Sequence, residues 1–202
     1  MPLFQSAVLN KYLKQQDDAS VHEAYARFRA HFHNPEVQAN IREAKEEQYQ
    51  EGFLRDLFVS VLGYTLNPQA GYDLTSEFKN EKGAKKADGA VLQNGKALAV
   101  IELKGTDTTD LASINAQAFN YKANHTDCVY VVTSNFERLR FFIDNAVEHL
   151  EFDLFTLTED RFRLLWLCLH RDNLLGGIPK KVKAESVQEE EQVTKRLYKD
   201  YS

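Results

Sequence analysis

The spacing of apolar residues changes near Gly71, and this change limits what the chain can fold into more than any other feature of the sequence. Before it, apolar residues recur at helical intervals, as they do between Val21 and Phe32. After it, short segments with alternating apolar residues follow one another, separated by turn-forming sequences at 80–83 and 93–95. The chain therefore combines a helical first third with a β-rich centre.

The order of the later segments predicts how the strands connect. Asn94-Gly95 favours a tight hairpin, which makes the strands at 85–93 and 97–105 antiparallel neighbours. A helix at 110–125 and two further strands follow, and a strand, a helix and a strand in that order imply a crossover connection. We expect an α/β fold with a mixed central sheet flanked by helices, and one more edge strand at 149–157.

The helical segments set the expected divisions of the chain. Asn34 is a good N-cap with Pro35 at the first helical position, and the pattern predicts one long helix from there to about Leu62, where Gly63 stops it. The expected divisions are an N-terminal helical extension at 1–34, a core at 35–178, and a linker that passes into a helix at 179–202.

Composition excludes some classes of protein. Of the 202 residues, 43% are hydrophobic and 27% are charged, which is typical of a globular domain. No apolar run approaches the roughly 20 residues of a membrane helix, and no signal-peptide pattern is present. Cys128 and Cys168 lie in apolar runs, which indicates buried free thiols and a cytoplasmic protein. The net charge of −5 argues against a nucleic-acid binder, so composition by itself leaves DNA unsupported.

Three charged residues of the predicted hairpin form the candidate site: Asp88 on its first strand, and Glu102 and Lys104 at the end of its second. Glu102 and Lys104 share one face of their strand, about 6–7 Å apart. Counting from the turn places Asp88 nearly opposite Glu102, and facing carboxylates repel each other unless a cation lies between them. Taken singly, an Asp-Gly turn and a Glu-Leu-Lys strand end are common surface features. Their joint arrangement favours a site for a hard divalent cation such as Mg²⁺.

Polar residues also interrupt the apolar face of the long helix. Counting back seven residues from Leu54 reaches Glu47, and counting back four reaches Gln50. Either the helix leaves the core here, or it passes over the metal site and supplies a third carboxylate. Gln117 and Tyr121 share one helix face, which ordinary packing or support of the site would explain.

These residues carry a family resemblance. Ala87-Asp88-Gly89-Ala90 followed by Val100-Ile101-Glu102-Leu103-Lys104 resembles the PD-(D/E)xK nuclease motif, with Ala87 in place of the family's proline. Glu47, sixteen residues before Gly63-Tyr64, is similar to the glutamate on the first core helix of many restriction nucleases. The sequence from Gln117 to Tyr121 resembles the Gln-x-x-x-Tyr helix of type I and type IIG restriction enzymes. The landmarks span 45–142, about half of the chain, and are similar to the N-terminal nuclease domain of a type IIG restriction-modification enzyme.

The resemblance implies a restriction-endonuclease-like core and Mg²⁺-dependent hydrolysis of DNA phosphodiester bonds, with Mn²⁺ able to substitute. It implies that Asp88, Glu102 and the backbone carbonyl of Leu103 bind the metal. Lys104 would then neutralise charge that develops on the phosphate, or help to orient and deprotonate the attacking water. The further residues implied are Glu47 as a catalytic carboxylate, and Gln117 and Tyr121 in support.

The resemblance also implies partners. Double-stranded DNA would be the substrate, and the natural protein would continue into a methyltransferase and target-recognition region, where S-adenosylmethionine would bind. Two alternatives stay open: the nuclease module of a type I restriction subunit or another defence system, and a non-catalytic nuclease-like fold used for binding or assembly. The intact Asp88, Glu102 and Lys104 argue against the non-catalytic alternative.

Overall fold

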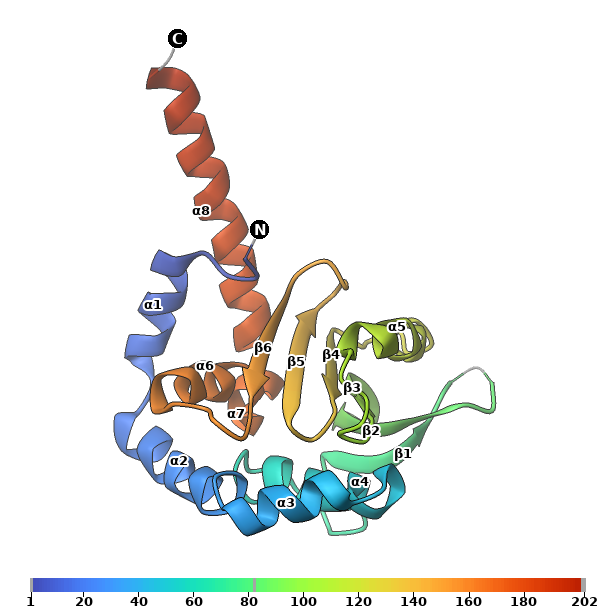
Figure 1. Cartoon of the computed structure of the whole chain (residues 1–202). Coiled ribbons are helices and arrows are strands. Elements are labelled where there is room, and N and C mark those ends of the chain that lie inside the picture. The colour runs from blue at the N-terminus through green and yellow to red at the C-terminus, as the bar shows by residue number, and fades with distance from the viewer. Residues whose placement is uncertain (1, 82, 201–202) are drawn as a thin grey trace.

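Six strands form one mixed sheet in the computed structural model, which describes residues 2–81 and 83–200. The strands are β1 (Leu74–Lys79), β2 (Lys86–Gln93), β3 (Lys96–Leu103), β4 (Tyr130–Ser134), β5 (Arg138–Ile143) and β6 (His149–Asp153). They lie side by side in their order along the chain, and β3–β4 is the parallel pair among antiparallel neighbours. The expected α/β class, with a mixed sheet flanked by helices, is confirmed (Figure 1).

The β2–β3 hairpin turns at Asn94 and Gly95, as the sequence predicts. Both residues have positive φ, 53° and 75°, which a tight two-residue hairpin turn requires and which asparagine and glycine tolerate. At the other end of the hairpin, Gly89 pairs with Ile101. The register of the hairpin therefore brings the segments that contain Asp88 and Glu102 together.

Helices cover both faces of the sheet. The helices are α1 (Ser6–Gln15), α2 (Asp18–Phe32), α3 (Pro35–Glu43), α4 (Glu46–Phe53), the π-helical η1 (Leu54–Val59), the 3-10 helix η2 (Leu111–Ile114), α5 (Asn115–Ala123), α6 (Glu159–Leu169), α7 (Arg171–Leu175) and α8 (Ile178–Asp200). On one face, α2, η1 and α6 bury their apolar side chains against Ile101 and its neighbours in a large core. On the other face, Ala118 and Tyr121 of α5 pack on Val100 and Val131 in a smaller core. The crossover from β3 to β4 runs through η2 and α5.

The single helix predicted for 35–62 is wrong in its interior. Its start is as expected, because the Asn34 side chain accepts hydrogen bonds from the first turn and Pro35 follows. The helix breaks at Ala44 and Lys45, whose ψ angles of 139° and 155° are extended, and a new helix begins at Glu46. The side chain of Gln48 stabilises this new start by accepting a hydrogen bond from the Lys45 N–H at 2.8 Å.

The second half of that segment winds as a π-helix. Phe53, Leu54, Leu57 and Phe58 are all completely buried. The segment from Leu54 to Val59 winds with the wider turn of a π-helix, and all four side chains lie in the large core. Gly63 then ends the segment with a φ of 86°, as the sequence predicts.

The chain after Pro179 differs from the expected linker, because it is helical from Ile178 onward. Proline fits the first turn of a helix, where its missing N–H has no intrahelical partner to lose. The first part of α8 packs against α1, where Tyr12 and Lys11 bind Glu185 at 2.5 Å and 3.2 Å. Beyond this contact α8 projects from the rest of the molecule, and both termini lie on that side (Figure 1).

Two other sequence expectations concern the thiols and the membrane. Cys128 and Cys168 are buried and free, as predicted, and burial raises the pKa of the Cys128 thiol to about 11. Among the helices that the structure describes, none has both the length and the apolar character needed to cross a bilayer.

Candidate active site

The hairpin brings the Asp88 side chain to the end of β3. One step beyond the Gly89–Ile101 pair, the register sets Asp88 beside Glu102. The Asp88 Oδ2 atom accepts a hydrogen bond of 2.7 Å from the backbone N–H of Leu103. Burial raises the pKa of Asp88, while the Leu103 N–H and the charge of Lys104 act in the opposite direction. The two carboxylates that the sequence predicts to face each other therefore lie at one strand end.

Glu102 is the most enclosed charged group of the site. Its side chain is only 1% exposed, and its Oε2 atom has no hydrogen-bond partner among the described residues. Burial, and after it the charge of Asp88, raise the pKa of Glu102 to about 7. A buried carboxylate oxygen without a partner is costly, so this arrangement needs a reason beyond stability.

Thr133 on β4 belongs to the same surroundings. It is the register partner of Glu102 in the parallel β3–β4 pair, and it is completely buried. Its hydroxyl also has no hydrogen-bond partner among the described residues. Two buried polar groups without hydrogen-bond partners among the described residues therefore lie on neighbouring strands at this end of the sheet.

Lys104 lies between carboxylates from two elements. Its Nζ atom is 3.2 Å from Glu102 Oε1 and 3.4 Å from Glu46 Oε1, and its side chain is 23% exposed. Its backbone N–H donates to the carbonyl of Ser134 at 2.9 Å, which fixes the chain just after β3. Burial alone would lower the pKa of Lys104, but Glu102, Glu46 and Asp88 outweigh it and raise that pKa. The ammonium group therefore stays charged and accessible to a ligand.

The structure brings Glu46 to this group, and it does not bring Glu47. Glu46 and Glu47 are the first two residues of α4, and Glu47 is exposed to solvent. Gln50, one turn after Glu46, donates to Glu46 Oε1 at 3.2 Å and also hydrogen-bonds Asp88, which acts to lower the pKa of Asp88. The winding of α4 therefore turns Glu46, and not Glu47, toward Lys104 and Asp88.

Sequence signals for Glu46 existed but were ambiguous. Phe53 and Leu54 are both completely buried, so either can anchor the count. Counting back seven residues from Phe53 reaches Glu46, whereas the same count from Leu54 reaches Glu47. Thr133 carried no comparable signal, because its neighbourhood depends on the pairing of β3 with β4.

Close packing also positions the site. A side chain at Gly89, the residue after Asp88, would meet Leu54 at 3.3 Å and Ile101 at 3.4 Å. Leu54 is the first residue of η1, directly after the helix that carries Glu46 and Gln50. The absence of a side chain at Gly89 therefore lets this helical segment lie directly on the β2–β3 hairpin.

Gln117 and Tyr121 lie on α5, over the other core. Gln117 is exposed and its Nε2 atom donates to the Tyr121 hydroxyl at 3.1 Å, whereas Tyr121 is 5% exposed. Both line a polar pocket together with Lys85 and Lys86, and the ring of Tyr121 also packs in the smaller core. The structure thus places them beside the start of β2.

The donor set at the hairpin end consists of oxygen atoms. In the part of the chain that the structure describes, no three His, Cys, Asp or Glu side chains lie close enough together to hold a metal ion. Mg²⁺ does not require such a cage, because it keeps several waters and binds through one or two carboxylates. Asp88, the unpartnered Oε2 of Glu102 and the carbonyl of Leu103 fit that requirement, and the absence of thiol or imidazole ligands disfavours zinc.

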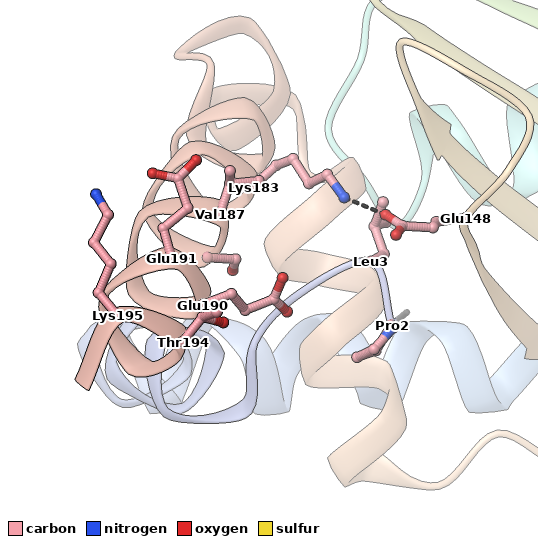
Figure 2. Close-up of a pocket in the computed structure, with 10 residues that line it drawn as sticks. Pro2, Leu3, Glu148, Lys183, Val187, Glu190, Glu191, Thr194 and Lys195 are labelled. Carbon is pink, nitrogen blue, oxygen red and sulfur yellow. Dashed lines mark hydrogen bonds and ion pairs between the residues drawn. The ribbon is translucent and has the colours of Figure 1, made fainter. Parts of the chain in front are cut away.

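An apolar pocket of about 460 Å³ lies elsewhere, between the N-terminal segment and α8 (Figure 2). Leu3 and Val187 contribute apolar surface to it, and Lys183 forms an ion pair with Glu148 at its edge. Its lining has no convergent oxygen ligands beside an unpartnered buried group. The hairpin end is therefore the better candidate for chemistry.

Comparisons with protein-family models, with curated proteins and with solved structures gave no match to this chain. The case for a function therefore depends on the geometry of the site and on the motif resemblance.

Proposed function

We propose that the chain is a Mg²⁺-dependent DNA endonuclease domain with a restriction-endonuclease-like core of the PD-(D/E)xK type. One observation carries the proposal. Asp88 and Glu102 come from paired strands, Lys104 lies 3.2 Å from Glu102, and one buried oxygen of Glu102 has no partner. A buried carboxylate oxygen without a partner is costly, and a bound metal ion would provide the missing partner.

In this proposal the negatively charged residues bind the metal ion and the positively charged Lys104 acts on the phosphate or the attacking water. Asp88, Glu102 and the Leu103 carbonyl would hold the ion, and the Leu103 N–H already orients Asp88. When bound, the ion supplies Lewis-acid polarisation of the scissile phosphate and makes water a stronger nucleophile. Lys104 would neutralise negative charge on the phosphate in the transition state or help to orient the attacking water.

Glu46 would take the role that the resemblance assigns to the first core helix. It contacts the Lys104 ammonium from the side opposite the strand, and Gln50 links it to Asp88. In this arrangement Glu46 positions Lys104 and adds negative charge near the metal. Glu47, which is exposed, has no part in the proposed site.

The biological setting rests on the motif resemblance. We propose a cytoplasmic restriction-modification protein of type IIG, acting on double-stranded DNA. The nuclease module of a type I restriction subunit is the alternative, since it shares the Asp88, Glu102 and Lys104 motif.

Calorimetric titration with Mg²⁺ and with Mn²⁺, followed by a duplex-cleavage assay, tests the proposal. Wild-type chain should bind the ions and Asp88→Ala should not, because half of the carboxylate set is lost. Asp56→Ala is the matched control: it removes a half-buried carboxylate of η1, and ion binding should persist. Equal ion binding by wild type and Asp88→Ala, or no binding by either, would reject the site.

A further inference from the structure

A polar pocket of about 570 Å³ adjoins the catalytic strand. It is lined by the start of β2 and by α5, through Lys85, Lys86, Ala116, Gln117, Asn120 and Tyr121. None of these six residues is acidic, although the chain as a whole carries a net charge of −5. Hydrogen-bond donors and positive charge are therefore concentrated in this pocket, although the net charge of the chain is negative.

The donors of the pocket are available to a ligand. Lys85 is exposed, and no carboxylate of the described residues forms an ion pair with it. Lys86 pairs with Glu77 at 3.0 Å, but both side chains are more than half exposed, and such pairs are weak enough to exchange.

The amides add neutral donors. Asn120 accepts from Asn124 through its Oδ1 atom at 3.3 Å, so its own NH₂ group stays free to donate. The Tyr121 hydroxyl accepts from Gln117, which leaves its O–H to donate. Two ammonium groups with amide and phenol donors are a suitable set for the anionic oxygens of a phosphate.

The position of the pocket indicates which phosphate. Lys86 is two residues before Asp88 on β2, and two residues of extended chain span about 6–7 Å. Successive phosphates of one DNA strand advance about 3.4 Å along the duplex axis. A strand whose scissile phosphate lies at Asp88 therefore presents a phosphate two or three nucleotides away to Lys85 and Lys86.

We propose that this pocket binds a backbone phosphodiester of the DNA strand that enters the active site. The inference rests on the proposed nuclease function and adds a place where the strand is held. A continuous strand contacts both the pocket and the catalytic hairpin, so the two contacts reinforce each other, whereas a free phosphate gains one of them. Backbone contacts of this kind position DNA without reading its sequence.

Fluorescence anisotropy with a labelled duplex, in metal-free buffer at about 50 to 200 mM salt, tests the proposal. The variant Lys85→Ala/Lys86→Ala removes up to two phosphate contacts, each of which contributes about 0.9 to the slope of log K against log salt. Its Kd should rise, and its loss of affinity across this salt range should be about tenfold smaller than that of wild type. Lys180→Ala/Lys181→Ala, an exposed lysine pair on α8, is the matched control and should behave as wild type.

Two results would overturn the proposal. One is a slope of log K against log salt in Lys85→Ala/Lys86→Ala that equals that of wild type, and the other is a wild-type chain that binds no duplex at the lowest salt. Inorganic phosphate, matched in ionic strength to chloride, tests whether the duplex occupies the pocket. It should weaken duplex binding by wild type and leave binding by Lys85→Ala/Lys86→Ala unchanged, because phosphate and duplex compete for the pocket. Equal weakening in both proteins would place the competed contact elsewhere and also overturn the proposal. Because binding is measured without metal, these outcomes are independent of whether the chain cleaves DNA. Circular dichroism should show the same fold for all variants, since the substituted lysines are exposed.

Discussion

Two carboxylate clusters lie along the segment formed by α4 and η1, and they handle burial in opposite ways. At one, Asp56 accepts hydrogen bonds from Tyr49 at 2.8 Å and pairs with His31 at 3.0 Å. Burial acts to raise the pKa of Asp56, but His31 and Tyr49 outweigh it, so that this pKa is lowered. At the other, burial and a neighbouring carboxylate raise the pKa of Glu102 to about 7.

The two carboxylates therefore differ in their effect on stability: the charge of Asp56 stabilises the fold, and the charge of Glu102 opposes it. Asp56 has its partners within the chain, so its charge contributes to stability. Glu102 has an oxygen with no partner among the described residues, and its charge opposes that of Asp88. Groups of the second kind are found at functional sites, where a ligand supplies what the chain does not.

The largest effect is expected for Lys104→Ala on DNA cleavage. Loss of a cation that acts on charge in the transition state should lower the cleavage rate by about 10²–10³-fold. Lys96→Ala removes an exposed lysine of the same strand and serves as the matched control. Cleavage of a labelled duplex in Mg²⁺ measures both, and near wild-type cleavage by Lys104→Ala would make the lysine a structural one.

The next effect distinguishes Glu46 from Glu47. Glu46→Gln keeps the shape but removes a charge 3.4 Å from the Lys104 ammonium, so cleavage should fall by about 10- to 100-fold. Glu47→Gln alters an exposed neighbour of the same type and should stay within about twofold of wild type. The reverse order of the two rates would show that the helix presents its other face in the active state.

The third effect is on stability without metal. The pKa of Glu102 is raised from 4.5 to about 7, so the folded chain binds the extra proton and loses stability as the pH rises through this range. Glu102→Gln should relieve about 3 kcal/mol at pH 8, which raises Tm by about 6–12 °C. Near pH 4 Glu102 is protonated in the folded chain and largely so in the unfolded chain, and the two proteins should melt close together. A lower Tm for Glu102→Gln at pH 8 would mean that the carboxylate already has a partner.

The smallest effect has the opposite sign and belongs to the other cluster. The pKa of Asp56 is lowered below 3.8, so its charge stabilises the fold above that pH, and the contribution disappears as the pH falls through the folded-state pKa. Asp56→Asn should cost about 1 kcal/mol near pH 7, discounted for a side chain about one-third exposed. Thermal unfolding should show the deficit at pH 7, and the deficit should shrink as the pH falls below 3.8. An unchanged Tm at pH 7 would remove the contrast between the clusters.

The sequence predicts those parts of the molecule whose conformation depends on residues close by in the chain. The strand segments follow from alternation, and the hairpin follows from the positive-φ preference of Asn94-Gly95. That hairpin also brings the segments of Asp88 and Glu102 together, but their pairing depends on the register shift between Val91 and Leu92. Without the shift, the register of the Gln93–Lys96 pair would set Asp88 opposite Ile101. The break at Ala44 and Lys45 was missed because their extended backbone depends on contacts rather than on a local breaker residue.

The remaining misses have a common physical cause. Glu46 and Glu47 differ by one residue, and Phe53 and Leu54 are both completely buried, so the apolar pattern does not say which of the two sets the inner face of α4. That face is fixed by the packing of the helix on the sheet, which sequence neighbours do not specify. Thr133 reaches Glu102 through a parallel pairing of strands separated by a crossover, and local pattern does not specify that register.

The wide turn at Leu54–Val59 gives this segment an unusual response to changes in length. A π-turn completes one turn with one residue more than an α-turn, so deleting one uncharged residue there would restore regular winding and leave the elements on either side facing as before. Each residue of an α-helix turns the chain by about 100°, so deleting Gly52 within α4 would instead rotate the residues before it by that angle about the helix axis. That rotation would carry Glu46 away from Lys104 while every charged residue of the chain is retained. The two shortened chains would have almost the same composition, and only the second would present a different edge of α4 to the β2–β3 hairpin.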